Sequence, residues 1–289
     1  MNYINVKFRI SKYCMYRSDM KNKGQYSFYV KLHGFTLTLM ILFLGSISLQ
    51  AQKFNKLIWS DEFNGTGGPD STKWSYELGG GGWGNKELQY YTRDNKNAYL
   101  SDGNLVIKAI KEDINEYHYS SARIITKGKF EVKYGRLEVR AMIPIALGTW
   151  PTFWMMESNR DKVRWPTCGE VDILENFGYD SLKMRGTIHR GENISRKHIS
   201  SGNTIQIENS SKVFHVYAIE WDSTKIDFFV DKIKYHTYEK TPDTIVGWPF
   251  DQPSYLLLNL AIGGCDGGLG VDDSRFPHKF QIDYIRVYQ

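Results

Sequence analysis

The 289-residue chain is poor in cysteine, with three in total, and it contains no Cys-x-x-Cys pair and no histidine cluster with metal-ligand spacing. A transition-metal site built from such ligands is therefore not indicated. Cys14 lies near the N-terminus, far in sequence from Cys168 and Cys265. These last two are compatible either with a disulfide or with two buried free thiols, because their Cα separation does not follow from sequence.

Sustained helical periodicity with caps at both ends is also absent, as are linkers, repeats and low-complexity segments. The chain from residue 53 onward consists of short strand-like runs separated by Gly, Asn, Asp and Pro. Examples are residues 57–59, 104–109, 129–132, 136–140, 225–230 and 280–288. Many short strands with turns between them are typical of a sandwich or barrel. We therefore predict an all-β protein with a single domain over residues 53–289.

The chain after residue 51 carries no excess of positive charge. The formal net charge is +5, but residues 1–51 alone carry +6, so the remainder carries −1. This distribution gives no support for a nucleic-acid partner.

Residues 1–51 have the layout of an export signal, with basic residues, an apolar run over 35–49 and the small residue Ala51. The run is short for a transmembrane helix, although an uncleaved anchor is the alternative. No cysteine follows it directly, which argues against a lipid anchor. We predict a leader over residues 1–51, no stable membrane insertion after its removal, and a secreted, periplasmic or cell-surface location.

A glycine run at residues 79–82 lacks the Lys-Ser/Thr pair of a phosphate-binding loop. Glycine lets the backbone approach a ligand closely, so Trp83 and Asn85 would offer a ring face and an amide to a sugar. A plain surface loop is the alternative.

Aromatic residues make up 15% of the chain, which suits either sugar stacking or a large core. We expect one of Trp150 and Trp154 in a cleft and the other in the core, although regular strand parity would put both on one face.

Three carboxylates gather in the segment Glu170-Val171-Asp172-Ile173-Leu174-Glu175. The apolar residues favour a strand, in which Glu170 and Asp172 share a face. Glu175 would then fall on the apolar face, where an unpaired charge is costly. A β-bulge would return Glu175 to the face of the other two and bring the glutamate carboxyls to about 5–5.5 Å, the spacing of a retaining glycosidase. A solvated strand face with ordinary acids is the alternative.

This segment resembles the ExDxxE signature of glycoside hydrolase family 16. The preceding Trp165-Pro166-Thr167-Cys168-Gly169 is similar to the bacterial laminarinase branch, the endo-1,3-β-glucanases. The resemblance covers nearly all of residues 53–289, through segments 59–65, 83–92, 124–130, 150–155, 259–264 and 283–288.

The resemblance implies a β-jelly-roll of two curved antiparallel sheets with a concave glycan cleft. It implies that Glu170 is the nucleophile, Glu175 the general acid/base and Asp172 the assisting carboxylate, with no cofactor for catalysis. The expected partner is a β-1,3-glucan polysaccharide, and the expected state is a monomer. The candidate sugar-binding residues are Trp83, Asn85, Arg123, Trp150, Trp165, His189 and Asn259, although a lone histidine such as His189 is equally compatible with a structural role.

Many relatives bind a structural calcium on the convex face, and the matching positions here are the carbonyls of Glu62 and Gly103 and the side chain of Asp283. An oxygen-only site of this kind suits calcium. The alternative is that Asp283 pairs within the sheet.

The chain departs from the laminarinase pattern after residue 264, where relatives usually place Asn-Trp and this chain has Cys265-Asp266. A stacking ring is therefore expected to be missing at one edge of the cleft. Other β-glycans remain open as substrates, namely mixed-linkage glucan, agar, porphyran and carrageenan, as does a non-catalytic glycan-binding role. Sulfated galactans should favour a basic cleft, so the net charge of −1 favours a neutral glucan.

Overall fold

The computed structural model describes residues 54–191, 198–240, 247–267 and 270–289. The predicted leader over residues 1–51 lies outside this part of the chain and stays a prediction. Within the described ranges, no helix is long and apolar enough to cross a membrane.

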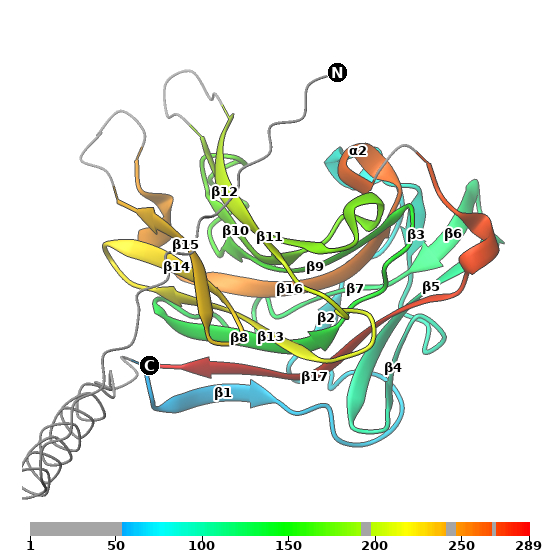
Figure 1. The fold of residues 1–289 in the computed structure, drawn as a ribbon, viewed down its shortest axis with the longest axis horizontal. Coiled ribbons are helices and arrows are strands. Elements are labelled where there is room, and N and C mark those ends of the chain that lie inside the picture. The colour runs from blue at the N-terminus through cyan, green and yellow to red at the C-terminus, as the bar shows by residue number, and fades with distance from the viewer. Residues whose placement is uncertain (1–53, 192–197, 241–246, 268–269) are drawn as a thin grey trace, which may run out of the picture. The chain divides into compact units, whose positions relative to one another are not determined.

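Two β-sheets stack face to face to form the molecule (Figure 1). The sheet that bears the cleft described below, here called the cleft sheet, has the order β12-β11-β10-β9-β16-β7-β2 in the described residues. Its strands are β2 (Ser75–Tyr76), β7 (Arg123–Ile125), β9 (Thr149–Glu157), β10 (Glu170–Glu175), β11 (Lys183–Gly191), β12 (His198–Gln206) and β16 (Ser254–Ile262). Neighbouring strands are antiparallel throughout this sheet, as expected for a sandwich rather than an α/β fold.

The second sheet, here called the outer sheet, has the main order β15-β14-β13-β8-β17-β5-β6-β3, with β1 pairing β17 and β4 pairing β5. Its strands are β1 (Leu57–Asp61), β3 (Gln89–Tyr91), β4 (Ala98–Ser101), β5 (Asn104–Ile114), β6 (Tyr117–Ser121), β8 (Gly135–Met142), β13 (His215–Trp221), β14 (Lys225–Val230), β15 (Ile233–Glu239) and β17 (His278–Tyr288). Helical structure in the described residues consists of short turns, η1 (Gly82–Gly84), η2 (Gly178–Asp180), η3 (Pro249–Asp251), α2 (Gly264–Gly267) and η4 (Asp273–Arg275).

The hydrophobic core lies between the two sheets, and strand alternation decides which side chains enter it. On β9, Phe153 and Met155 belong to this core, whereas Trp150 and Trp154 belong to separate apolar clusters on the opposite face. Because the cleft sheet curves, that opposite face is concave (Figure 1). The predicted all-β jelly-roll with a concave face is thus confirmed.

One predicted strand is wrong. Residues 129–132 form a turn followed by an isolated bridge from Val132 to Ser254, instead of a strand. Gly128 has a φ of 72°, and the amides of Lys129 and Phe130 both donate to the carbonyl of Thr126. The apolar side chain that suggested a strand is used for packing instead, since the Phe130 ring stacks on Trp59 at 4.7 Å.

Candidate active site

The bulge predicted in the acidic segment is present in β10. Asp172 pairs with Trp154 of β9, but the next partner of β9, Phe153, pairs with Leu174. The pairing with β11 shifts at the same place. The extra residue lets two consecutive side chains, Ile173 and Leu174, enter the core, where both are fully buried. Glu175 is thereby returned to the face of the other two carboxylates.

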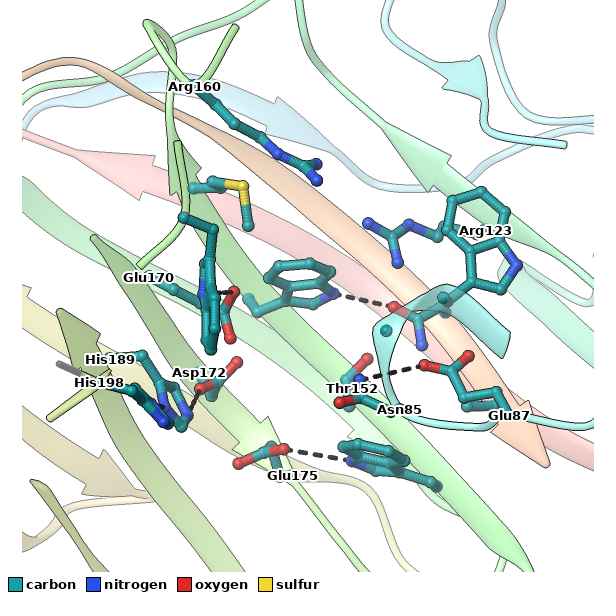
Figure 2. A pocket seen from close by; sticks show the side chains of 18 residues that line it. Asn85, Glu87, Arg123, Thr152, Arg160, Glu170, Asp172, Glu175, His189 and His198 are labelled. Carbon is teal, nitrogen blue, oxygen red and sulfur yellow. Dashed lines mark hydrogen bonds and ion pairs between the residues drawn. The ribbon is translucent and has the colours of Figure 1, made fainter. Parts of the chain in front are cut away.

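Each of the three carboxylates has a polar side chain beside it in the cleft, a hydrogen-bond donor for the two glutamates and a histidine for Asp172 (Figure 2). The indole N–H of Trp165 donates to Oε2 of Glu170 at 3.1 Å. The indole N–H of Trp150 donates to Oε1 of Glu175, also at 3.1 Å. The third carboxylate, Asp172, lies 3.1 Å from Nε2 of His189. Two tryptophans and one histidine therefore fix the orientation of the acidic group.

The acidic group holds protons more tightly than free carboxylates do. Burial and the charge of Asp172 raise the pKa of Glu170 to about 8. The same two causes raise the pKa of Glu175 to about 8, and burial alone raises that of Asp172 to about 8. Three like charges this close together cannot all ionise cheaply, so the carboxyls share protons near neutral pH. A site that holds both a protonated and an ionised carboxyl can combine acid catalysis with nucleophilic attack.

The carboxylates lie in a cleft of about 370 Å³ on the concave face. Of the residues that the sequence proposed for sugar binding, all seven line this cleft, namely Trp83, Asn85, Arg123, Trp150, Trp165, His189 and Asn259. They come from β7, β9, β11 and β16 and from two connecting segments, so the fold brings together residues up to 176 positions apart (83 to 259). Their contact with a sugar stays a prediction.

Arg123 is more enclosed than a simple sugar ligand would be. It is 6% exposed, and its guanidinium packs against the rings of Trp83 and Trp154 at 4.8 Å each. Its Nε lies 2.5 Å from Oε2 of Glu77. Arg123 therefore holds the two tryptophan rings in position at one end of the cleft.

The expected division of Trp150 and Trp154 between cleft and core is wrong, because both line the cleft. β9 is unbroken over Thr149–Glu157, so Pro151 does not disturb the alternation and the two residues keep the same parity. Trp154 donates its indole N–H to Oδ1 of Asn259 at 2.8 Å.

The glycine run does bring its neighbours to the cleft, where Trp83, Gly84 and Asn85 line one end. A Cβ on Gly80 would lie 2.0 Å from the ring of Tyr117, so any other residue at this position would have to displace that ring. Trp83 has a φ of 49°, and its indole N–H donates to the carbonyl of Gly79. The loop therefore has a defined conformation that presents Trp83 and Asn85.

Sequence reasoning missed two titratable residues of the cleft, Glu87 and His198. Glu87 is buried, which raises its pKa, and it accepts hydrogen bonds from Gln89, Tyr91 and Asn85. Its place two residues after Asn85 in a recognised segment was a usable signal.

His198 carried no such signal, because the β11–β12 pairing alone brings it beside His189. Arg160, Thr152 and Met156 line the cleft as well.

Both cysteines of the domain are free thiols, so the disulfide is not formed. Cys168 is fully buried and Cys265 is exposed, which also differs from the expected pair of buried thiols. Cys265 lies at the edge of the cleft, where its amide donates to the carbonyl of Asn85 at 2.7 Å.

One proposed calcium ligand, the side chain of Asp283, pairs with Arg140. The carboxylate of Glu62 receives two hydrogen bonds from Arg286 at 3.0 and 2.8 Å, but the ligand expected at Glu62, as at Gly103, is the backbone carbonyl. A calcium ion would have to displace Arg140 to use the Asp283 carboxylate, so the present arrangement does not fit an oxygen-only cage. The calcium site stays a prediction.

Elsewhere in the described residues, ligand atoms of Glu170, Asp172 and His189 lie within 4.8 Å of one another, but acid–base chemistry at this site requires no metal.

A β-sandwich whose concave face carries paired glutamates among tryptophans has the architecture and the chemistry of a glycoside hydrolase. Comparison with known proteins agrees with this class. Residues 85–286 match the model of the glycosyl hydrolases family 16. A β-glucanase of Rhodothermus marinus is 40% identical over 268 residues, which cover 88% of this chain and 94% of the relative.

Other relatives show the range of the similarity. The crystal structure of a laminarinase from Flavobacterium sp. UMI-01 is 44% identical, with a TM-score of 0.73, and the match covers 81% of this chain and all of that chain. A keratan-sulfate endo-1,4-β-galactosidase of Sphingobacterium multivorum is 36% identical over 241 residues, 81% of this chain and 55% of the relative. The chain therefore belongs to glycosyl hydrolases family 16.

Proposed function

We propose that this family 16 hydrolase is a secreted endo-glycosidase that cleaves β-1,3-glucan with retention of configuration. The observation that carries the proposal is the bulged strand β10, which sets Glu170, Asp172 and Glu175 side by side on the floor of an aromatic cleft. The laminarinase and β-glucanase relatives support the glucan substrate. The net charge of −1 after residue 51 supports a neutral polysaccharide, and the export-signal layout of residues 1–51 supports secretion.

In the first step, the carboxylate of Glu170 attacks the anomeric carbon while Glu175 donates its proton to the glycosidic oxygen. The bond to the leaving glucan breaks, and a glycosyl ester to Glu170 forms. Because this removes the negative charge of Glu170, the pKa of Glu175 falls and its carboxylate can act as a base.

In the second step, Glu175 takes a proton from water while the water oxygen attacks the anomeric carbon. The ester bond breaks, which restores ionised Glu170 and protonated Glu175. Asp172 assists both steps from between the two glutamates, and His189 holds its carboxylate at 3.1 Å. Trp150 and Trp165 orient the catalytic carboxyls through their indole N–H groups.

The test is hydrolysis of a polysaccharide panel of laminarin, lichenan, agarose, porphyran, carrageenan and keratan sulfate, with linkage analysis of the products. We expect laminarin to be cleaved fastest, and the first product to appear as the β-anomer by NMR. Cleavage of agarose or keratan sulfate at an equal or higher rate would overturn the glucan assignment in favour of a galactan.

Variants separate catalysis from mere binding. We expect Glu175→Gln to lower kcat on laminarin by about 10²–10⁴-fold, the usual contribution of general acid–base catalysis. Glu170→Gln should lower it at least as much, because no covalent intermediate can form. Glu131→Gln, at an exposed glutamate, serves as the matched control. Wild-type protein that binds laminarin without releasing reducing ends would instead identify a glycan-binding protein.

A further inference from the structure

The glycine run at residues 79–82 has the backbone of a segment that would not keep one conformation by itself. Gly79, Gly81 and Gly82 have positive φ values of 108°, 87° and 76°. Glycine has more backbone freedom than any other residue, so ordering several in a row is costly in entropy. Contacts from elsewhere in the molecule must therefore hold the run in the conformation that brings Trp83 and Asn85 to the cleft.

Gly80 differs from its neighbours, because its φ lies outside the left-handed region that favours glycine. Alanine could adopt this backbone without strain, so conformation does not explain the glycine. The explanation lies in Tyr117, since a Cβ on Gly80 would overlap atoms Cζ, Cε1 and Oη of that side chain. The Tyr117 ring thus lies directly on the backbone of Gly80, in the space that a side chain would fill.

Tyr117 also makes a hydrogen bond to the next residue of the run. The amide of Gly81 donates to Oη of Tyr117 at 2.7 Å. Ring contact at Gly80 and hydrogen bond at Gly81 act on consecutive residues, so this one side chain fixes both the path of the backbone and the direction of a peptide group.

The two ends of the run are held by backbone hydrogen bonds instead. Gly79 both donates to and accepts from Tyr91 of β3, at 2.9 Å each. The carbonyl of Gly82 accepts from the amides of Asn85 and Glu87 at 2.8 and 3.1 Å. Tyr117 therefore acts on the middle of the run, between these two attachments.

The position of Tyr117 is set by the outer sheet. Tyr117 begins β6 and pairs with Ile114 of β5, while β6 runs parallel to β3 on its other side (Figure 1). Its ring lies 5.5 Å from that of Tyr90 on β3. Tyr117 is outside the set of described residues that line the cleft. Any effect on a bound glycan must therefore pass through the run.

Trp83 is the side chain most directly affected by the run. Its indole N–H donates to the carbonyl of Gly79 at 3.1 Å, and its ring lies 5.3 Å from that of Tyr91 and 4.8 Å from the guanidinium of Arg123. A displaced run would move that carbonyl and the attachment of Trp83 together. The conformation of the run thus decides whether the ring faces the cleft.

We propose that Tyr117 is a positioning residue for glycan binding, which holds the glycine run at Gly80 and Gly81 and so keeps Trp83 and Asn85 in place. Without it, the run populates other conformations, and the apparent affinity falls in proportion to the competent fraction. The three carboxylates belong to β10 and are oriented by other residues, so the cleavage rate of bound glycan is retained. This inference rests on the proposed function, which supplies the glycan.

The first test removes the hydroxyl of Tyr117 and keeps its ring. For Tyr117→Phe we expect KM on laminarin to rise by about two- to tenfold, the effect of one lost neutral hydrogen bond, and kcat to stay within about twofold. Tyr119→Phe is the matched control on the same strand, because its hydroxyl donates to Asp273 at 2.8 Å instead. This control should keep both constants.

The second test is a double-mutant cycle between the ring and the glycine beneath it. Gly80→Ala should raise KM, because the added methyl displaces the Tyr117 ring. In Gly80→Ala/Tyr117→Ala the methyl meets no ring, so KM should rise no further than in Tyr117→Ala alone. Fully additive effects would show that the two positions act independently and would overturn the proposal.

Amide hydrogen exchange measures the contact without any substrate. Exchange at Gly81 should be about two- to tenfold faster in Tyr117→Phe than in the wild type, since its acceptor is gone, and unchanged in Tyr119→Phe. A thermal melt of each variant checks that the domain is folded. Faster exchange with an unchanged KM would show that the order of the run does not matter for binding, which overturns the proposal.

A fall in kcat at unchanged KM would also overturn it, because Tyr117 would then act on the carboxylates. The substrate assignment fails separately, if the wild type cleaves another glycan of the panel and leaves laminarin intact. The KM comparison and the cycle are then made with that glycan, and the same outcomes support or overturn the role of Tyr117.

Discussion

His189 lies between Asp172 and His198, with Nε2 3.1 Å from Oδ2 of Asp172 and Nδ1 2.7 Å from Nε2 of His198. To donate to an ionised Asp172, Nε2 of His189 must carry a proton, so Nδ1 of the neutral ring accepts from His198. Burial lowers the pKa of His198, which favours its neutral form. We therefore expect His198 to act as a positioning residue that selects the tautomer of His189.

Replacing His198 should weaken catalysis without removing a catalytic group. His198→Phe keeps a ring beside Trp165, which lies 4.8 Å from the present ring, but removes the nitrogen that fixes His189. We expect kcat/KM to fall by about five- to tenfold, as for one lost hydrogen bond. With Asp172 less well neutralised, the acid limb of the pH profile should move to higher pH. His198→Gln, whose amide can also donate, should recover part of the loss. An unmoved pH profile in His198→Phe would contradict the positioning role.

The raised pKa of Glu170 makes the active site a source of instability at high pH. Burial and the charge of Asp172 raise this pKa to about 8, from an ordinary value of 4.5 in the unfolded chain. Well below pH 4.5 the carboxyl is protonated in both states and has almost no effect on the free energy of unfolding. As the pH rises to 8, the folded state binds more protons than the unfolded state, so stability falls.

Glu170→Gln, which carries no charge, should therefore match the Tm of the wild type at pH 4 and exceed it at pH 8. We expect a difference of at least about 2–4 °C, the shift that 1 kcal/mol produces in a domain of 150–250 residues. Thermal melts across this pH range measure it, with the exposed Glu131→Gln as the control that should show no such divergence. A variant that is less stable than the wild type at pH 8 would show that the ionised carboxylate is well solvated.

The two cysteines of the domain should differ sharply in reactivity. Cys168 is fully buried, and burial together with the charge of Glu157 raises its pKa to about 11. Cys265 is exposed. Because the thiolate is the reactive form, we expect the native domain without its leader to take up one equivalent of maleimide, and two after denaturation. Cys265→Ser should abolish the native labelling, and a Cys168–Cys265 peptide in a non-reducing digest would contradict the free thiols.

A calcium ion at Asp283 would have to compete with Arg140, the present partner of that carboxylate. If the family site exists in this chain, calcium added after chelation should raise the Tm, and Arg140→Ala should enlarge that rise by removing the competitor. Asp283→Ala should abolish the rise. A calcium-dependent rise that survives in Asp283→Ala would place the ion elsewhere.

Local pattern in the sequence was sufficient for the central part of the site. Glu175 lies out of phase with Glu170 and Asp172, and alternation along a strand leaves a bulge as the means of keeping its charge out of the core. The glycine run likewise indicated how Trp83 and Asn85 reach a ligand. These predictions needed nothing beyond backbone geometry and the cost of burying a charge.

The contacts between strands could not be predicted in the same way, because they depend on register and on the curvature of the sheet. The 2.7 Å contact between His189 and His198 follows from the pairing of β11 with β12, and Arg185 meets Glu175 through the pairing of β10 with β11. Similarly, Asp283 and Arg140 lie on neighbouring strands of the outer sheet and pair there, which no sequence spacing revealed.

The sequence by itself thus determined the all-β class, the bulge and seven of the proposed sugar-binding residues that line the cleft, since each follows from alternation, turn chemistry or a recognised segment. The tertiary structure alone decided how the carboxylates are held and that Cys168 and Cys265 stay apart. The physical reason is that side-chain direction is a local property of a strand, whereas distance between strands is fixed by the packing of the whole sandwich.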